Sequence, residues 1–403
     1  MSAGRALAGI IVPIYLAELG FSGFRLGELF VLVALVSAVM STLIGLASDR
    51  IGRKPFLVAL PLLTACAAVA FATVRSLPVL FIAAAAGSFG RGAGAGAGAI
   101  GPYQPAELAL VTEVTPDASR NSAFGRLQFG SSVGALAGSL LAMLGNVHAM
   151  SPQAAQGAFR AAFIATAAVS LAAAALAMRI AEPKRPVREG VRKHRPHLPS
   201  KSRNLLVRLW ATNSVNGLAI GMIGPFLTYW FYRRYGVGSA EIGLLYAGVN
   251  AISMTSTLSA SGLARRWGIV RTVATVRILT AILIVPMALA PSFLLAGITY
   301  MIRMMIQRAG MPLRQSYVLA MADPEERSSV AALSNLPSQV AMGLSPLASG
   351  YMLDEVSLSM PFEIAGLLQL VNGVMYWWFF RNMPPAEEIA ANKEIPADTD
   401  DSA

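Results

Sequence analysis

The spacing of long apolar runs constrains this chain more than any other feature. Twelve runs follow one another, separated by short stretches rich in charge, Pro or Gly, and a run of about 20 residues is enough to cross a bilayer as a helix. Charged residues make up only 13% of the 403 residues, about half the share of an average soluble protein. The sequence therefore predicts an all-α polytopic membrane protein, and it excludes a soluble enzyme, a disordered scaffold and a nucleic-acid module.

The twelve runs fall into two sets of six. Those of the first set are Ala3–Leu19, Leu26–Ala47, Phe56–Val74, Leu77–Ile100, Ala123–Leu144 and Phe159–Met178. Those of the second set are Leu205–Tyr232, Ile242–Leu263, Thr272–Ala290, Phe293–Met311, Val330–Leu353 and Phe362–Phe380. The first run is shorter at its start than the seventh, so we expect a shortened first helix or a natural start upstream. Cys66, the one cysteine, lies in the third run and is expected to be a small buried side chain.

A basic segment at residues 181–204 divides the chain. Its content of Pro and charge cannot support a membrane span, so we interpret it as a linker between six-helix halves at 1–180 and 205–381, with an acidic tail at 382–403. The net charge of +11 comes largely from this linker and from short basic loops on the same side. Because Lys and Arg are in excess on cytoplasmic loops, the pattern predicts cytoplasmic termini in the plasma (cytoplasmic) membrane.

The two halves repeat each other at a nearly constant offset. The matches at 212 residues are Gly9 with Gly221, Pro13 with Pro225 and Arg91 with Arg303. The matches at 216 residues are Gly27 with Gly243 and Gly52 with Gly268. Each match is weak alone, but together they predict two six-helix repeats in parallel. Such repeats are typical of transporters, whose substrate site lies near mid-membrane between the halves.

A charged loop follows the second run, with the sequence Gly45-Leu46-Ala47-Ser48-Asp49-Arg50-Ile51-Gly52-Arg53-Lys54. It resembles the G-x-x-x-D-R-x-G-R-K signature of the major facilitator superfamily, and with the span count and linker the resemblance covers nearly the whole chain. The resemblance implies two bundles of six transmembrane helices related by a pseudo-twofold axis along the membrane normal. Gly45 would permit close helix contact and Asp49 would pair with cations, which we interpret as a gating contact. The alternative is a basic turn that only sets topology.

Two arginines lie deep in the predicted spans. Arg91 resembles the membrane-embedded arginine of many family members, and Arg303 is its counterpart in the tenth run. A charge at this depth is costly and needs a cavity or a partner, so we expect both to bind substrate. The alternative is pairing with backbone carbonyls or with Glu107, a carboxylate of the fourth apolar region. Arg308 and Arg314 are weaker candidates.

Further substrate-binding residues follow from the resemblance, because the first, fourth, seventh and tenth helices line the central cavity in the family. Carried onto this chain, these residues are Tyr15, Asn213, Asn216, Tyr229, Trp230 and Gln307. The alternative for Tyr and Trp is an anchor at the membrane interface, and for the two Asn a hydrogen bond between helices.

The resemblance implies a secondary transporter that moves a small solute by alternating access. We expect a monomer in the lipid bilayer, without cofactor or metal. Gly130, Gly134 and Gly138 resemble the family's antiporter motif but lack its proline, which leaves proton-coupled efflux of a drug or metabolite open. The arginines favour an organic anion, because a carboxylate can take a bidentate bond from a guanidinium. The alternative is a non-transporting sensor or scaffold on the same fold; an enzyme is disfavoured because the three histidines fall outside the spans.

Overall fold

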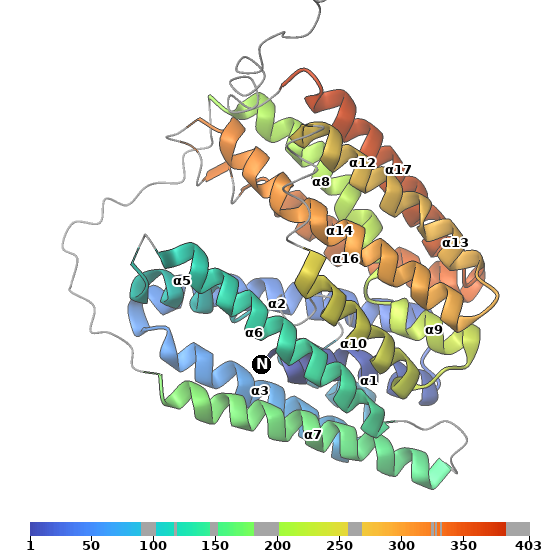
Figure 1. Ribbon diagram of the computed structural model, residues 1–403. Helices are drawn as coiled ribbons and strands as arrows, with labels where there is room; N and C mark the ends of the chain where they lie inside the picture. Colours follow the sequence, from blue (N-terminus) through green and yellow to red (C-terminus); the bar gives the residue numbers. More distant parts are fainter. Residues whose placement is uncertain are drawn as a thin grey trace, which may run out of the picture.

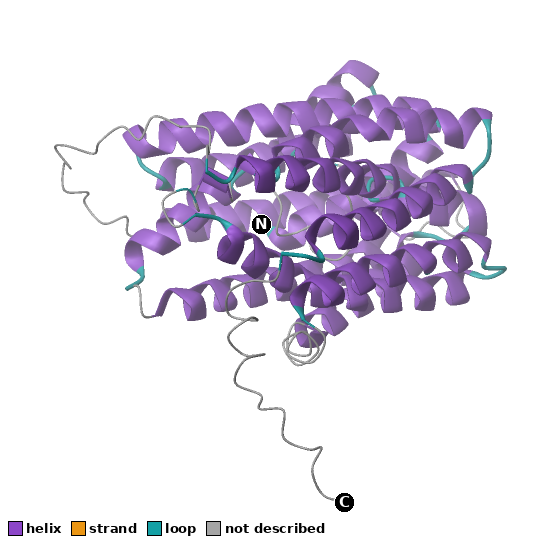
Figure 2. Ribbon diagram, turned by 90° about the horizontal axis from the view of Figure 1, so that it is seen from above, coloured by secondary structure: helices purple, strands orange, loops and turns teal. Residues whose placement is uncertain are grey.

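The computed structural model describes residues 1–89, 102–116, 119–145, 152–180, 201–256, 268–323, 326, 329–330 and 333–383. The regular secondary structure of these residues is helical (Figure 2), which confirms the predicted all-α fold. Arg91 and the linker lie outside the described residues.

The helices group into two halves that match the two sets of apolar runs (Figure 1). The N-terminal half contains α1 (Ser2–Glu18), α2 (Gly23–Ile51), α3 (Lys54–Thr73), α4 (Leu77–Gly87), α5 (Gln104–Val114), α6 (Arg120–Leu141), the 3-10 helix η3 (Ala142–Gly145) and α7 (Pro152–Met178). The C-terminal half contains α8 (Arg203–Ile223), α9 (Leu227–Tyr235), α10 (Ser239–Ser256), α12 (Ile269–Ile282), α13 (Ile284–Leu289), α14 (Phe293–Met321), α16 (Leu336–Glu355) and α17 (Met360–Phe380). The fourth predicted span corresponds to α4 and α5, the seventh to α8 and α9, and the ninth to α12 and α13.

The backbone at Gly52 and Gly268 supports the predicted repeat. Gly52 follows α2 with φ 105° and Gly268 precedes α12 with φ 79°, and both precede the third helix of their half. Residues with a Cβ rarely adopt positive φ. The two halves therefore make the same glycine-dependent turn 216 residues apart.

Five described segments are long and apolar enough to cross a membrane by length and composition alone. They are Gly23–Ser48, Lys54–Thr73, Ser122–Gly145, Ala154–Met178 and Ile269–Leu289. α14 has 29 residues but includes three arginines, which lower its hydropathy. Cys66 on α3 is exposed, so its predicted burial is wrong; α3 is apolar on its outer side too, and sequence alone does not tell that side from the packed one.

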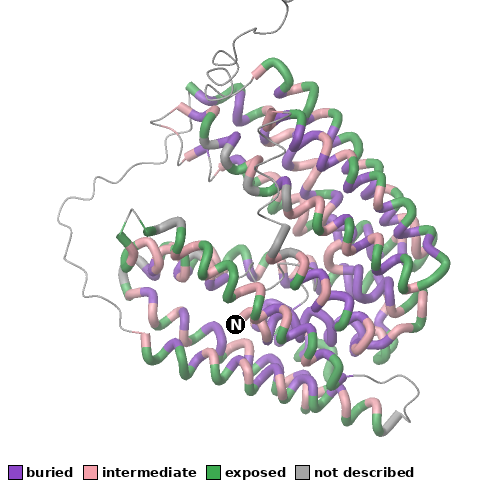
Figure 3. Tube along the Cα trace, viewed as in Figure 1, coloured by how far each residue is buried: buried purple, intermediate pink, exposed green. Residues whose placement is uncertain are grey.

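The ends of the helices form two groups. We call the end at Glu18, Gly23 and Glu355 the distal end, and the end at Ile51 and Arg203 the linker end. In Figure 1 the halves lie together at the distal end, while the linker-end parts of α6 and α14 lie apart. Buried residues gather where α1, α9 and α10 meet near the distal end (Figure 3).

Two repeat-related glycines allow the halves to meet. A Cβ on Gly27 of α2 would lie 2.6 Å from the carbonyl oxygen of Pro346 in α16, and a Cβ on Gly243 of α10 would lie 2.5 Å from that of Ser139 in α6. Backbone atoms cannot yield as a flexible side chain can. We call these two contacts, α2 with α16 and α6 with α10, the distal interface.

Replacing Gly27 by Ala should destabilise the protein. The added methyl group meets backbone that has nowhere to move, and overpacking of this kind costs about 1–3 kcal/mol. The measurement is the thermal unfolding midpoint in detergent, which we expect to fall in the Gly27→Ala variant. Gly157→Ala in α7 is the control, since a Cβ there meets nothing within 4 Å. Equal midpoints for the two variants would contradict the proposed close contact.

Candidate functional site

The carboxylate of Asp354 in α16 joins the two halves at the distal end. Its Oδ1 accepts the N–H of Gly23 at 2.7 Å, and its Oδ2 accepts the N–H of Phe24 at 2.7 Å. These N–H groups are among the first of α2, which have no partner within their own helix, and the helix dipole is positive there. Asp354 therefore caps a helix of the opposite half through two charge-assisted hydrogen bonds.

Further contacts close the distal end. The hydroxyl of Tyr232 in α9 donates to Oε1 of Glu18 in α1 at 2.6 Å. The rings of Phe30 in α2 and Phe226 lie 5.2 Å apart, edge to face. Polar and aromatic contacts thus reinforce the glycine contacts of the distal interface, and each joins residues of opposite halves.

The charged loop between α2 and α3 lies at the linker end. Arg53 is buried and its Nη2 lies 2.8 Å from Oε1 of Glu113 near the end of α5, so the loop is tied to the end of the fourth span. Lys54 begins α3 and is half-buried. The side chains of Asp49 and Arg50 lie outside the described set. Among the described residues no helix approaches Gly45 closely, since a Cβ there would meet nothing within 4 Å. The close contacts of α2 with the opposite half lie at the distal end instead.

Arg303 is turned into its own half. Its Nε donates to the carbonyl oxygen of Thr280 in α12 at 3.3 Å, and the residue is only 5% exposed. Gly310, two turns further along α14, also faces α12, where a Cβ would lie 2.8 Å from Val276. Arg303 therefore takes part in packing α14 against α12. Its hydrogen bond to a backbone carbonyl is the alternative to substrate binding that the sequence analysis left open.

Asn213 and Arg314 form a polar cluster inside the C-terminal half. Arg314 donates from Nη1 to Oδ1 of Asn213 at 2.9 Å and from Nη2 to Oδ1 of Asn335 at 3.3 Å. Asn213 donates from Nδ2 to the carbonyl oxygen of Ser334 at 2.7 Å. These bonds join α8, α14 and the start of α16, so Asn213 serves contact between helices.

Arg277 in α12 is a buried charge that sequence analysis did not single out. Its Nη1 donates to Oδ1 of Asn372 in α17, whose Nδ2 donates in turn to the carbonyl oxygen of Thr212 in α8. The guanidinium also lies over the ring of Tyr376 at 4.6 Å. The available signal was an arginine within the ninth apolar run, Thr272–Ala290.

The remaining predicted residues are not gathered at one place. Tyr15 packs its ring edge-on against Phe159 and Phe163 within the N-terminal half. Asn216 accepts from Nε2 of Gln369 in α17 at 3.3 Å. Tyr229 and Trp230 are buried near the distal end, and Gln307 is half-buried in α14.

Arg308 points to a different side of α14 from Arg303. At 3.6 residues per turn the two side chains are about 140° apart, and Arg308 lies towards the side of Met301, which contacts Gly248 of α10. This side of α14 packs on α10, and α10 in turn contacts α6 of the opposite half. It is half-buried, and its guanidinium makes no hydrogen bond or ion pair with the described residues.

The family model for the Major Facilitator Superfamily matches residues 1–306 and again residues 209–400. The chain belongs to this superfamily. The second match begins near the start of α8, in agreement with two repeated halves. A comparison with curated proteins finds no match.

Solved structures of transporters share the fold. A bacterial homologue of the human lysosomal transporter Spinster, inward-facing and unoccupied, has a TM-score of 0.68 at 15% identity, with 100% of this chain and 96% of that chain covered. The nucleoside transporter NupG has a TM-score of 0.67 at 14% identity, covering 94% and 98%. A D-xylose–proton symporter has a TM-score of 0.67 at 15% identity, covering 94% and 94%. These likenesses establish the fold of a membrane transporter.

Replacing Asp354 by Asn should loosen the distal end. The neutral amide cannot give two charge-assisted hydrogen bonds to α2, so a conformation with separated distal ends should gain population. Thr73 and Leu289 are both exposed at the distal ends of their helices, and each is replaced by a spin-labelled cysteine in a Cys66→Ser background. Double electron–electron resonance then measures the distance between the two labels. We expect a new population at longer distance. Glu355→Gln, next in sequence and exposed, is the control; an identical effect of both substitutions would refute the specific role of Asp354.

Proposed function

We propose that this protein is a secondary transporter that moves a small solute bearing a carboxylate across the cytoplasmic membrane by alternating access. Two features support the proposal: a closed distal interface, and a C-terminal half with arginines and few acidic groups. The single observation that carries the substrate class is the half-buried guanidinium of Arg308, which lies on the α10 side of α14 and has no ionic partner among the described residues.

Alternating access requires contacts between the halves that form at one end and separate at the other. The hydrogen bonds from Asp354 to α2 and from Tyr232 to Glu18 join the halves at the distal end. The basic linker favours a cytoplasmic location for the opposite end. The conformation then corresponds to a state closed towards the outside, and the likeness to an inward-facing Spinster homologue is consistent with it.

The charge of the C-terminal half supports an anionic group on the solute. The sequences of α8, α12 and α14 contain seven arginines and no Asp or Glu. Arg277, Arg303 and Arg314 donate to carbonyl or amide oxygens, which leave their positive charge uncancelled. A carboxylate bound at Arg308 would gain a bidentate hydrogen bond in surroundings of low dielectric.

The solved neighbours favour small-solute transport but differ in solute. They are named as a nucleoside transporter, a D-xylose–proton symporter and a bacterial homologue of the iron transporter ferroportin. The proposed carboxylate therefore depends on the arginines of this chain. Proton coupling and the direction of transport are separate proposals: we propose efflux driven by a proton gradient.

The decisive experiment is a transport assay with Arg308 variants. Inverted vesicles are supplied with a panel of labelled carboxylic acids, sugars, nucleosides and permanent cations, with and without a proton gradient. We expect a carboxylic acid to be transported, and Arg308→Gln and Arg308→Lys to reduce its rate at least about tenfold, because a point charge does not replace the planar fork. Arg271→Gln, at the exposed start of α12, should stay within about twofold, as surface substitutions usually do.

Two outcomes of this assay contradict the proposal. Robust transport of a permanent cation by the natural protein excludes the anionic class. Unchanged transport of every carboxylic acid by Arg308→Gln excludes Arg308 as the binding group. Loss of all transport in the Arg271→Gln control would show that the assay reports folding. The thermal unfolding midpoint of each variant distinguishes a loss of folding from a loss of solute binding.

Asp49 should affect the transport rate more than solute affinity. We propose that the loop of Asp49, Arg50 and Arg53 stabilises one conformation at the linker end, remote from a mid-membrane site. Asp49→Asn should slow transport while the half-saturating concentration changes less than about threefold. Arg126 is an exposed basic residue of α6, and the Arg126→Gln variant is the control for a charge whose only role is to set membrane topology. Transport by Asp49→Asn at the natural rate would leave topology as the sole role of this loop.

A further inference from the structure

Arg5 in α1 is a buried charge whose guanidinium has no hydrogen-bonded partner among the described residues. The residue is 8% exposed, and its Nε and Nη1 are buried and donate no hydrogen bond to the described part of the chain. Its guanidinium carbon lies 5.5 Å from the centre of the Tyr103 ring, which is a cation–π contact. Burial of unsatisfied charged donors is unfavourable, so a native group of this kind requires an explanation.

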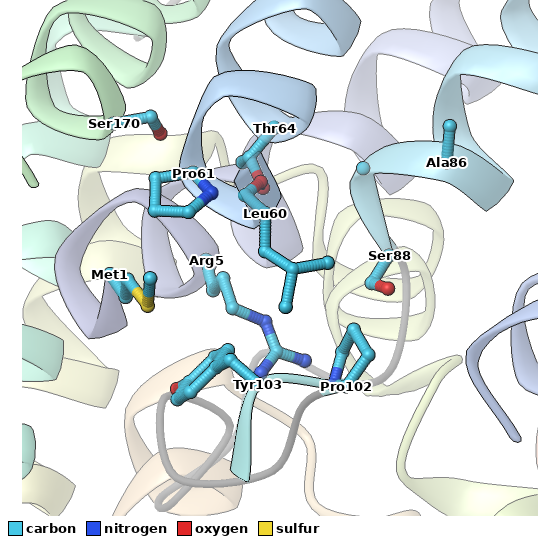
Figure 4. A pocket seen from close by; sticks show the side chains of 11 residues that line it. Met1, Arg5, Leu60, Pro61, Thr64, Ala86, Ser88, Pro102, Tyr103 and Ser170 are labelled. Carbon is cyan, nitrogen blue, oxygen red and sulfur yellow. The ribbon is translucent and has the colours of Figure 1, made fainter. Parts of the chain in front are cut away.

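Arg5 lines a small pocket inside the N-terminal half. The pocket lies among α1, α3, α4 and α7, and its wall includes Leu60, Pro61, Thr64, Ser88 and Ser170. Figure 4 shows the guanidinium of Arg5 between Tyr103 and Pro102, with Ser170 on the other side of the pocket. The cavity measures about 20 Å³, which is room for about one particle of water size.

Two of the hydroxyl groups that line this pocket already have hydrogen-bond partners. The hydroxyl of Thr64 donates to the carbonyl oxygen of Leu60 at 2.9 Å, and that of Ser88 pairs with the hydroxyl of Ser37 at 3.0 Å. Ser170 is 3% exposed, and its hydroxyl makes no hydrogen bond within the described chain. The described lining contains no Asp or Glu. An unpaired guanidinium in such a wall matches an anion and not a cation.

We propose that this pocket binds one small monovalent anion, of the size of chloride or of a single carboxylate group, held by Arg5. The anion accepts from the guanidinium, and it neutralises the buried charge. The described lining of this site belongs to the N-terminal half, whereas Arg308 lies in α14 of the other half, so it is separate from the proposed solute site. Its occupancy would stabilise the packing of α1 against α7.

The test measures anion-dependent stability of the full-length protein and needs no transport. Thermal unfolding midpoints in detergent are recorded while sodium gluconate is replaced by sodium chloride or sodium formate at constant ionic strength. A ligand that binds the folded state raises the midpoint with its concentration. We expect both small anions to raise the midpoint of the natural protein, and sodium sulfate, which is larger and divalent, to have little effect.

Substitutions then assign the effect to the pocket. Arg5→Gln should weaken the apparent anion affinity at least about tenfold, in line with the loss of a charged donor. Arg160→Gln, exposed in α7, should leave the affinity unchanged. Should Arg5→Gln fail to fold, Arg5→Lys keeps the charge and should still weaken the affinity, since it loses the planar donors.

Three results would overturn the proposal. One is a natural protein whose midpoint does not depend on chloride or formate. Another is an Arg5→Gln variant whose midpoint depends on the anion as strongly as that of the natural protein, because the effect then comes from other sites. The same holds for Arg5→Lys where that variant is tested instead. The third is stabilisation by sulfate as strong as by chloride, which is incompatible with a cavity of this size.

Discussion

Each transmembrane helix must satisfy its own backbone, because lipid offers no partner for a free N–H or C=O group. This constraint turns the apolar runs into helices and confines their interruptions to places surrounded by protein. α4 ends at Ser88, whose φ is +55°, and there the side chain is buried and bonded to Ser37 of α2. The break between α8 and α9 at Pro225 is flanked by the buried residues Ile223 and Phe226. The interruptions thus occur towards the interior of the molecule, where side chains and neighbouring helices replace water.

The same absence of water decides which arginines the bundles can hold. Arg277, Arg303 and Arg314 each find carbonyl or amide oxygens on a neighbouring helix. Such bonds hold the helices of the C-terminal half together, and they leave its positive charge uncompensated. Arg308 and Arg5 differ, because the guanidinium groups of both lack hydrogen bonds with the described residues. Groups engaged in packing have a structural role, whereas groups with unused donors are the ones available to an anionic ligand.

Close approach of backbones explains how two rigid halves can meet and separate. Gly27 and Gly243, related by the repeat, let α2 and α10 contact α16 and α6 of the opposite half. Contacts of this type depend on van der Waals packing at short distance, and they are lost together when the helices move apart. Asp354 adds directional hydrogen bonds to the end of α2. The distal interface therefore combines tight apolar contact with a few polar bonds, which suits a junction that forms and breaks as a unit.

The sequence by itself determined the helical fold, the twelve spans, the division into repeated halves and the family, because run length, loop charge and the Asp49–Lys54 loop are local properties of the chain. It also found the buried arginine Arg303, since a charge in an apolar run is visible without coordinates. Only the tertiary structure decided where each side chain is directed. Arg303 and Arg308 are five residues apart, yet one faces α12 and the other lies on the side of α14 that meets α10. Asp354 meets Gly23 across 331 positions of sequence. Such partners are set by the packing of helices from distant parts of the chain, and no local pattern records which side of a helix another helix will cover.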